Sequence, residues 1–453
     1  MLPPPGSNAP ALLALGHWLV DPLGSLDYGV RTFGDVYAVN NPLFGREVVV
    51  SHPELVRQIF IGDPDVYRAG EANAALGLIV GDRSVLLLDG ARHHRERRLL
   101  TPSFHGERMT AFAATMRRAA DRVIAGLPRG RPVATLRRMQ DLTFEIILET
   151  VFGAGAGGDA KVDRLGSALR DLLDRVQSPL GMLWLFPFAQ RDLGPLTGWA
   201  ALARSLAAAN AAIYDVISAA RAKPRGADVL SMLLGAVDED GEPMSDQELR
   251  DELVTLLLAG HETTATALAW ALAEIPRHPE VVQRIEDEIA ASDGSAAASM
   301  PFLDATIQEV LRVHPIVPLV GRRVSTDVKL RGYDVRAGTF VVINVTGVHH
   351  HPDAWTDPAE FSPARFVGKR PDPYAWLPFG GGARRCIGYA FALMETRVVL
   401  AACFAKLTFT CQPKPERVRL RGLFFGPSRQ GEVEVGDRRV AERPRAAHAP
   451  CAT

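Results

Sequence analysis

The feature that most constrains the fold is residues 379–388, a glycine-rich loop that presents Cys386 immediately before a predicted helix. Apolar residues recur on one face of residues 389–404 and predict that helix. Free amide groups and the helix dipole at a helix N-terminus lower the pKa of a thiol. Consecutive glycines at 380–382 let the backbone pass close to a flat cofactor, where a Cβ would collide. We therefore expect Cys386 to be a metal ligand, with Arg384 offering its donors to an anionic group of the cofactor.

Two other interpretations compete for this loop. A phosphate-binding loop would need Gly-Lys-Ser/Thr after the glycines, or Gly-x-Gly-x-x-Gly after a strand, and neither is present. A buried, inert side chain is the common state of a lone cysteine. The whole decapeptide, however, resembles the haem-binding loop of the cytochrome P450 superfamily, Phe-x-x-Gly-x-Arg-x-Cys-x-Gly, at Phe379, Gly382, Arg384, Cys386 and Gly388. The resemblance implies haem b (iron protoporphyrin IX) with a thiolate from Cys386 on the iron, and haem contacts from Phe379, Gly380, Arg384 and Gly388.

Composition and charge limit the remaining function classes. Of 453 residues, 47% are hydrophobic and 23% are charged, which is ordinary for a soluble globular protein with a large core. Residues 153–159 and 290–299 are short and lie between helical patterns, so no linker divides the chain. We expect one domain over residues 1–453 with a disordered tail at 437–453. The net charge of -1 argues against broad nucleic-acid binding.

The N-terminal region and the cysteines bear on location and redox chemistry. Residues 1–30 contain no Lys or Arg, and the apolar run 11–20 is too short to span a bilayer. We therefore expect no signal peptide and no membrane span, and a cytoplasmic, monomeric protein. The four cysteines, at 386, 403, 411 and 451, show no Cys-x-x-Cys spacing, which disfavours iron–sulfur clusters, structural zinc and a disulfide framework.

The hydrophobic pattern predicts a mainly helical chain with small β-sheets near both ends, an α+β fold. Strands are predicted at 36–40 and 47–51, as a hairpin, and at 328–330, 340–345, 418–420 and 432–435. Helices are predicted at 107–125, 139–150, 162–175, 199–222, 246–275 and 301–314. The helix at 246–275 is far longer than average and should cross most of the domain.

The long helix carries a second motif, Ala-Gly-His-Glu-Thr-Thr at residues 259–264. His-Glu begins the zinc-protease signature His-Glu-x-x-His, but Ala265 stands at the fifth position, so the second ligand is missing. Glycine at 260 lets something flat press against the helix, although a mid-helix threonine can simply bond back to the preceding turn. A similar pattern in the P450 superfamily lies over the oxygen-binding face of the iron. The resemblance implies proton delivery by Glu262 and Thr263 and a haem contact from Ala259.

A third motif pairs Glu309 with Arg312, one turn later on a predicted helix. Alone, such a surface pair adds only about 0.3–0.5 kcal/mol. Its context resembles the Glu-x-x-Arg pair of P450 proteins, joined by the arginine of a Phe-x-Pro-x-Arg-Phe segment. This implies a structural triad of Glu309, Arg312 and Arg365 that fixes the cysteine loop. The frequent glutamate before that arginine is Ala364 here, a departure that affects only a peripheral contact.

A fourth group is the basic stretch at residues 89–98, in which His93 and Arg97 lie one helical turn apart on the same face. A basic solvated helix is the plain alternative. A His-x-x-x-Arg at this point in P450 proteins grips a haem propionate, which implies that role for His93 and Arg97. Arg322 resembles another propionate ligand, with Arg323 beside it as a rival. Burying two haem carboxylates requires such cationic donors.

Together, these motifs make the chain resemble a soluble bacterial haem-thiolate monooxygenase. The resemblance implies the P450 fold, a triangular prism of helices with a long central helix across the haem. A thiolate ligand favours cleavage of the O–O bond, so the implied reaction inserts one atom of dioxygen into a C–H bond. A peroxide-using peroxygenase, which would usually lack the Glu262 and Thr263 pair, and a non-enzymatic haem sensor are the alternatives.

The electron donor and the substrate follow from what the chain lacks and from its apolar segments. No flavin or nicotinamide domain is evident, so we expect a separate ferredoxin or flavodoxin-type donor with its reductase, docking on Arg95, Arg98 and Arg385. The substrate is expected to be hydrophobic: a terpenoid, a steroid or a fatty acid. The expected pocket residues are Leu86, Leu183, Phe186, Leu258, Ile316, Val317, Leu423 and Phe424.

Overall fold

The computed structural model describes residues 2–104, 108–153, 159–178, 181, 184, 186, 189–192, 198–223, 226–292 and 299–438. The helices are α1 (Ala11–Val20), α2 (Pro22–Phe33), α3 (Pro53–Ile61), α4 (Gly77–Val80), α5 (Gly90–Leu100), α6 (Arg108–Gly126), α7 (Thr135–Phe152), α8 (Ala160–Val176), α9 (Trp199–Arg221), α10 (Val229–Leu233), α11 (Asp246–Glu274), α12 (Pro279–Ala291), α13 (Pro301–Val313), α14 (Val345–His349) and α15 (Tyr389–Lys406). The strands are β1 (Val36–Asn41), β2 (Gly45–Val50), β3 (Tyr67–Arg68), β4 (Pro132–Ala134), β5 (Leu319–Val324), β6 (Val328–Leu330), β7 (Tyr333–Val335), β8 (Phe340–Asn344), β9 (Leu407–Cys411), β10 (Val418–Arg421), β11 (Phe424–Pro427) and β12 (Glu432–Asp437).

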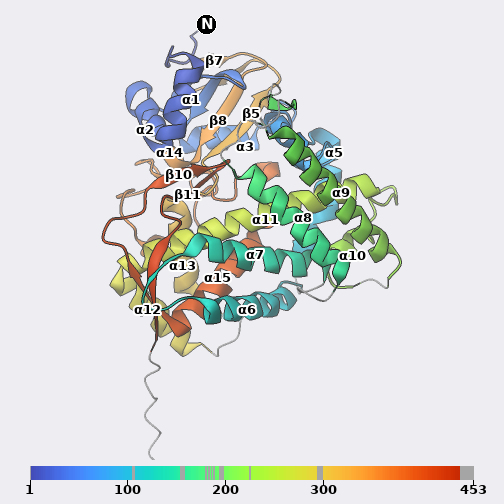
Figure 1. The fold of residues 1–453 in the computed structure, drawn as a ribbon. Coiled ribbons are helices and arrows are strands. Elements are labelled where there is room, and N and C mark those ends of the chain that lie inside the picture. The colour runs from blue at the N-terminus through green and yellow to red at the C-terminus, as the bar shows by residue number, and fades with distance from the viewer. Residues whose placement is uncertain are drawn as a thin grey trace, which may run out of the picture.

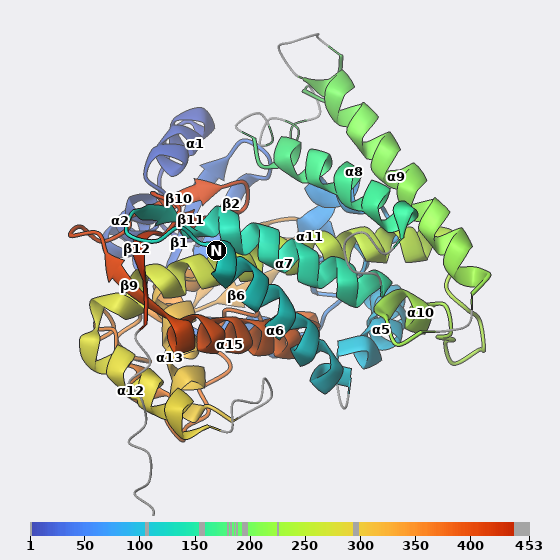
Figure 2. The same ribbon diagram turned by 60° about the horizontal axis from the view of Figure 1, so that its bottom comes forward.

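The long helix α11 passes through the middle of the molecule, and α6, α7 and α15 pack with it into the main core (Figures 1 and 2). Its start is set by a capping box: the Ser245 hydroxyl accepts the Glu248 N–H at 3.2 Å, and the Glu248 carboxylate accepts the Ser245 N–H at 2.8 Å. Pro276 follows its end and cannot continue the helix. Most of α11 beyond residue 263 is buried, so this helix is the axis on which the candidate site is built.

A five-stranded sheet with the order β1-β2-β8-β5-β3 lies at one end of the molecule beside α1, α2 and α3 (Figure 1). Only the β2–β8 pair is parallel, and the other neighbours are antiparallel. Alternate residues of β1, β2 and β8 bury Val and Ile side chains in a second core. Smaller sheets pair β10 with β11, β6 with β7, and β12 with both β4 and β9.

The predicted elements are present, with shifted ends. The hairpin is confirmed, with Val36 opposite Val50, and so are the other predicted strands and helices. The long α-helix ends at Glu274, one residue early, and continues as a short 3-10 turn. The predicted disordered tail begins too early, at residue 437, which is wrong. Asp437 of β12 pairs with Leu407 of β9, and Arg438 forms an ion pair with Glu286. Residues 439–453 lie outside the described part of the chain.

Among the described helices, α9 is long and apolar enough by composition to cross a membrane, with a mean hydropathy of 1.2 over an 18-residue window. One third of that window is buried inside the protein, and α9 packs along α8 and contacts α11. A helix that packs on the core of a soluble protein satisfies the same length and composition criteria, so this observation is weak evidence for a membrane span.

Candidate active site

The cysteine loop, residues 379–388, closes on itself before α15 begins, because the Cys386 N–H donates to the Phe379 carbonyl oxygen at 2.9 Å. The Cys386 side chain is exposed, whereas Cys403 on α15 is buried. Desolvation by surrounding groups nevertheless raises the pKa of the Cys386 thiol, and the Gly388 amide and the Arg97 cation oppose it only in part. The prediction that the protein's own groups lower this pKa is therefore wrong. A bound metal ion would reverse it, since coordination deprotonates a thiol outright.

Two glycines of the loop make room for Phe60 of α3, through its ring and its backbone, rather than for a flat cofactor. A Cβ on Gly381 would lie 2.4 Å from the ring of Phe60 on α3, and one on Gly382 would lie 2.5 Å from the Phe60 carbonyl oxygen. Gly380 has open space around its Cβ position but a φ of +61°, which favours glycine. Gly388 has nothing within 4 Å. The explanation by cofactor contact is therefore wrong for Gly381 and Gly382, because α3 occupies that side.

The three predicted propionate ligands, two arginines and a neutral histidine, have few partners among the described residues. His93 of α5 is buried with no hydrogen bond to Nε2. Its pKa falls to about 3, because burial and the Arg384 and Arg97 charges disfavour a further cation. Arg322 of β5 is 6% exposed, and among the residues that the structure describes it donates to the Gly321 carbonyl oxygen alone. Burial and then Arg384 lower its pKa to about 10. Within the described residues, neither Arg97 nor Arg322 has a carboxylate in ion-pair contact.

This arrangement fits a cofactor with buried carboxylates. Cations away from water are stable only when an anion compensates them, and haem carries two propionates. Arg323, the rival of Arg322, is exposed and pairs with Glu71 at 3.7 Å. The charge of Arg323 is therefore directed to the surface, and Arg322 is the arginine that lies near Arg384.

Arg384 has more protein contacts than the predicted propionate ligands His93, Arg97 and Arg322. Its guanidinium donates to the Val85 carbonyl oxygen at 3.0 Å, to the Leu88 carbonyl oxygen and to the Asp89 carboxylate. These bonds join the cysteine loop to the segment that precedes α5. Phe379 packs against Trp376 and Tyr389, with ring centroids 5.9 and 6.3 Å apart, and so holds the other side of the loop in the core.

The second motif, residues 259–264, contains the most exposed residue of the middle of α11. Ala259 is exposed and Thr263 is partly so, whereas residues 264–273 are all buried. The Thr263 hydroxyl donates to the Ala259 carbonyl oxygen at 2.6 Å, so the back-bonded alternative is present here. The hydroxyl oxygen remains free to accept another hydrogen bond. A Cβ on Gly260 would lie 3.1 Å from Ile147 of α7, so close helix packing explains this glycine.

Glu262 points away from solvent toward α7 and the end of α8. It is 2% exposed, and its Oε2 accepts from Gln140 Nε2 at 2.8 Å and from Gln177 Nε2 at 3.0 Å. Burial raises the pKa of this carboxyl, and the two amide donors oppose the rise. The sequence analysis missed both glutamines, because isolated Gln residues on amphipathic helices carry no signal.

The structure brings Glu309, Arg312 and Arg365 together. Arg312 donates to both carboxylate oxygens of Glu309 at 2.7 and 2.9 Å, and both side chains are fully buried. Arg365 Nε lies 3.3 Å from Glu309, and the Ser362 N–H donates to the same carboxylate at 2.7 Å. His349, which the sequence analysis missed, accepts the Leu377 N–H at 2.7 Å and contacts the Arg312 carbonyl oxygen at 3.0 Å. The network therefore links α13 to the chain that enters the cysteine loop.

The expected basic docking patch is largely neutralised. Arg95 forms ion pairs with Glu96, Asp238 and Glu248, and Arg98 pairs with Glu239. Arg385 is exposed and lies over the Tyr389 ring at 4.0 Å. The patch as predicted is wrong for Arg95 and Arg98, because the segment before α11 supplies acids that a sequence pattern does not place.

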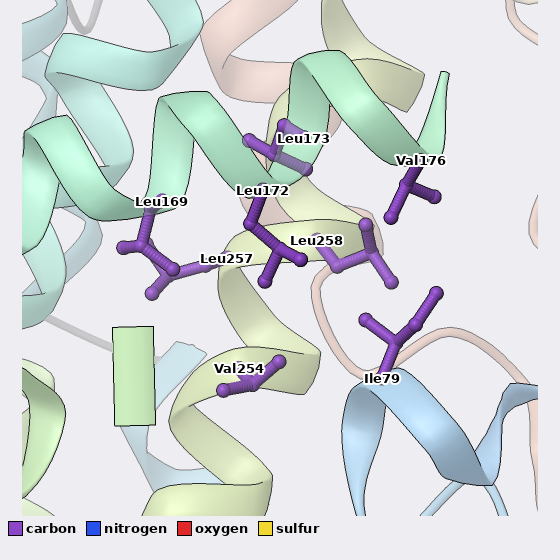
Figure 3. A pocket seen from close by; sticks show the side chains of 8 residues that line it. All are labelled: Ile79, Leu169, Leu172, Leu173, Val176, Val254, Leu257 and Leu258. Atoms are coloured by element: carbon purple, nitrogen blue, oxygen red, sulfur yellow. The ribbon is translucent and has the colours of Figure 1, made fainter. Parts of the chain in front are cut away.

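An apolar pocket lies between α4, α8 and α11 (Figure 3). Its lining is aliphatic throughout: Ile79, Leu169, Leu172, Leu173, Val176, Val254, Leu257 and Leu258. Its cavity volume is about 10 Å³, close to the minimum that holds one water molecule. The side chains of α8 and α11 face each other across it (Figure 3).

Only one of the predicted pocket residues, Leu258, lines this pocket. Leu423 is 44% exposed at the turn between β10 and β11, while Ile316 is buried in the main core. The others that are described, Leu86, Phe186, Val317 and Phe424, are partly buried outside its lining. Leu183 lies outside the described residues. The α8 leucines were missed because their regular apolar stripe is equally typical of a helix that packs on a core.

A second cluster, Asp35, His52 and His351, has ligand atoms within 4.8 Å of one another. Its hydrogen bonds argue against a metal site. Nδ1 of His52 and Nδ1 of His351 each accept a backbone N–H, from Glu54 at 3.1 Å and from Asp353 at 3.2 Å. The ring protons are therefore on the Nε2 atoms, which point at carboxylates and are the atoms a metal would need free.

Comparison with known proteins gives one consistent result. The family model described as Cytochrome P450 matches residues 3–432. A Mycobacterium tuberculosis protein named putative cytochrome P450 135B1 is 38% identical over 443 residues, covering 95% of this chain and 91% of that protein. Putative cytochrome P450 138 of the same organism is 36% identical over 435 residues, covering 95% of each chain.

Solved structures give the same fold. A retinoic acid-bound cyanobacterial CYP120A1 superimposes with a TM-score of 0.83 at 23% identity, covering 97% of this chain and 100% of that chain. The cytochrome P450DA heme domain also gives a TM-score of 0.83, at 24% identity, covering 97% of this chain and 98% of that chain. At these identities the likeness is evidence for the architecture alone.

Proposed function

Since the chain belongs to the cytochrome P450 family and is a monooxygenase of that family, we propose that it inserts one oxygen atom of dioxygen into a C–H bond of an apolar small molecule. The observation that carries this proposal is the accessible Cys386, which lies near Arg97, together with His93 and Arg322 near Arg384. His93, Arg97 and Arg322 are buried or half-buried and have no carboxylate in ion-pair contact among the described residues. A cysteine for the iron, and arginines and a histidine free of carboxylate partners for the propionates, are what a carboxylated porphyrin requires of its site.

The residues that would hold haem b are Cys386 at the iron and His93, Arg97 and Arg322 at the propionates. Haem with a cysteine thiolate ligand supplies the activation of dioxygen that no side chain can provide. Arg384 acts differently in this proposal: its bonds to the segment before α5 fix the loop and leave few of its donors for the cofactor. Phe379, Gly380 and Gly388 shape the loop that presents the sulfur. Ala259, exposed on α11, is a small residue where the cofactor would approach that helix.

We propose that Glu262 and Thr263 handle protons for the reaction. Thr263 Oγ1 already donates a hydrogen bond to the Ala259 carbonyl oxygen, which leaves its lone pairs to accept a hydrogen bond from a donor. Glu262 is a buried carboxyl with a raised pKa, so it can hold a proton closer to neutral pH than an exposed carboxyl can. This pair also favours a monooxygenase over a peroxide-using enzyme, which has less need of proton delivery.

The substrate class follows from the aliphatic lining between α8 and α11. Eight side chains line the pocket without a polar group, so binding would depend on apolar contact area. Terpenoids, steroids and fatty acids fit this requirement. The present volume of about 10 Å³ admits none of them, so α8 or α4 must move away from α11 when the substrate binds.

We propose that a separate ferredoxin or flavodoxin-type protein, with its reductase, supplies electrons. The exposed Arg385, one residue from Cys386, remains a candidate contact on the docking face, while the paired Arg95 and Arg98 contribute little net charge. We also propose that the protein is cytoplasmic and monomeric, where a separate electron donor can reach it.

Spectroscopy of the reduced carbon monoxide complex tests the ligand. The haem protein should show the red-shifted Soret band of thiolate ligation, and Cys386→Ser should lose both this band and oxygenase activity. Cys403→Ser, which changes a buried cysteine in the core, is the matched control and should keep both. A normal band in the Cys386→Ser protein would remove the basis of the proposal.

A further inference from the structure

The two glutamines that hold Glu262 belong to different parts of the molecule. Gln140 lies within α7, which packs closely along α11, and it is 7% exposed. Its neighbour Thr143 fixes the same interface, because its hydroxyl contacts both the ring and the carbonyl oxygen of His261 at 3.0 Å. Gln140 therefore cannot leave Glu262 unless the core of the molecule opens.

Gln177 is positioned by the pocket wall instead. It follows Val176, the last residue of α8, and Val176 lines the apolar pocket together with Leu173 and Leu172 (Figure 3). Gln177 is partly buried, and its Nε2 reaches Glu262 Oε2 at 3.0 Å. The end of α8 thus contacts the pocket through Val176 and the acid on α11 through the next residue.

The pocket dimensions couple these two contacts. A cavity of about 10 Å³ has no room for a substrate, so a ligand that binds there must displace α8 or α4 from α11. The α8 wall is the larger of the two, because α8 supplies Leu169, Leu172, Leu173 and Val176 to the lining and α4 supplies Ile79. A hydrogen bond already at 3.0 Å weakens steeply when its atoms separate further. Movement of α8 lengthens the Gln177 contact with Glu262, and with it the 3.4 Å contact of Gln140 Nε2 with Gln177 Oε1. The shorter contact of Gln140 with Glu262, at 2.8 Å, joins α7 to α11 and does not depend on α8.

We propose that Gln177 is a positioning residue that reports pocket occupancy to Glu262, so that an apolar ligand between α8 and α11 withdraws one of the two amides that hold the carboxylate. This inference rests on the proposed function, since it assumes that the substrate binds in the α8–α11 pocket. It adds a control step: the acid is held as a carboxylate while the pocket is closed, and takes up a proton from solvent when the ligand binds.

The direction of the proton movement follows from the hydrogen bonds. An amide donor stabilises the charged carboxylate, so loss of Gln177 raises the pKa of Glu262 further. The ligand-bound protein therefore binds more protons, and ligand affinity increases as the pH falls. The other charged or titratable groups that influence this region are His261 on α11, Arg137 on α7, Arg421 on β10, and Arg170 and Asp174 on α8.

None of these groups should reproduce the effect of Gln177. Burial and then Arg170 and Arg137 lower the pKa of His261 to about 4, so it is neutral near pH 7. Asp174 pairs with Arg137 at 3.6 Å, but both side chains are more than half exposed and are therefore screened by solvent. The variants below separate Gln177 from these neighbours.

The test is calorimetric titration of the haem protein with progesterone, a neutral apolar probe, in two buffers of different ionisation enthalpy. The difference between buffers gives the protons taken up on binding. The wild-type protein should take up a fraction of one proton, Gln140→Leu should also do so, and both Gln177→Leu and Glu262→Gln should take up none. Uptake by Gln177→Leu equal to that of the wild type would overturn the proposal.

A second measurement needs no ligand. Infrared titration of the haem protein follows the protonated carboxyl band that disappears in Glu262→Gln. Gln177→Leu should move this titration to higher pH, as ligand binding does, and an unmoved titration contradicts the proposal. A thiolate spectrum and oxygenase activity retained in every glutamine variant, together with equal proton uptake, would reject this inference while leaving the proposed function intact.

Discussion

The cysteine region and the pocket region of this protein are stabilised by different physics. The cysteine region, formed by residues 379–388, α5 and the Glu309 network, contains a buried ion-pair network, the buried His93 and glycines against a fixed ring. The pocket region, formed by the facing sides of α4, α8 and α11, consists of aliphatic side chains without polar contacts. Charged and strained positions accept one residue type, whereas an aliphatic wall accepts several of similar volume. The chemistry is therefore specified far more tightly than the substrate.

The largest effect should come from removing the shared carboxylate of the cysteine region. Glu309→Ala leaves the buried Arg312 without its bidentate partner and also releases Arg365 and the Ser362 amide. Breaking a buried ion pair costs about 3–5 kcal/mol, so we expect a loss of this size in the free energy of unfolding, measured by urea denaturation. Asp27→Ala is the control, because it breaks an exposed pair with Arg31 and should cost less than about 1 kcal/mol. Equal losses in the two variants would contradict the comparison.

The loop glycines sharpen the same point within a single segment. Gly382→Ala should cost about 2–4 kcal/mol, because the residue has a φ of +61° and its Cβ would also lie 2.5 Å from the Phe60 carbonyl oxygen. Gly380→Ala has the same φ but open space, so backbone strain of about 1–2 kcal/mol is its only penalty. Thermal unfolding of the two variants measures the difference. Similar values would show that α3 can yield at Phe60.

These glycines also show what the sequence can and cannot predict. The pattern around Cys386 predicted a tight loop and a metal ligand, because few residue types satisfy a tight turn and a thiolate together. The structure confirms the loop, and the ligand stays a prediction. The partner of Gly381 and Gly382 was wrong, since Phe60 is more than three hundred positions away in the chain and only the tertiary structure brings it there. Long-range contacts of this kind have no local signal.

The contrast between local signals and long-range contacts also separates the other sequence predictions that succeeded from those that failed. The predicted helices and strands are present because their hydrophobic periodicity is local, and α11 was recognised by its length. Helices α2, α3 and α12 were not predicted. The glutamines around Glu262, the acids that pair with Arg95, and the α8 side of the pocket were missed or misjudged, because amphipathic helices look alike until their neighbours are known. Sequence therefore predicts local elements better than the long-range contacts that surround Glu262 and line the pocket.

The pH dependence of stability provides the next contrast. The folded-state pKa of His93, about 3, lies below its unfolded value of 6.5, so the neutral imidazole contributes stability that is complete above pH 6.5. This contribution is lost as the pH falls from 6.5 through 3, with a slope of up to about 1.4 kcal/mol per pH unit. Urea denaturation of the haem-free protein should show this slope, and His93→Gln should have a shallower one. Parallel curves would mean that His93 is not desolvated.

The pocket region should respond least to a change that conserves volume. Leu172 lines the pocket from α8 and is 3% exposed, so Leu172→Met keeps its apolar contacts and should cost less than about 1.5 kcal/mol. Leu172→Ala removes those contacts and should cost about 2–5 kcal/mol, which shows that the position is packed. In titrations followed by the Soret band, the Met variant should change the relative affinities for terpenoid, steroid and fatty-acid ligands while the reduced carbon monoxide spectrum stays constant. If Leu172→Met destabilised the protein as much as Glu309→Ala, the aliphatic wall would be as specific as the ionic network, and the contrast between the two regions would fail.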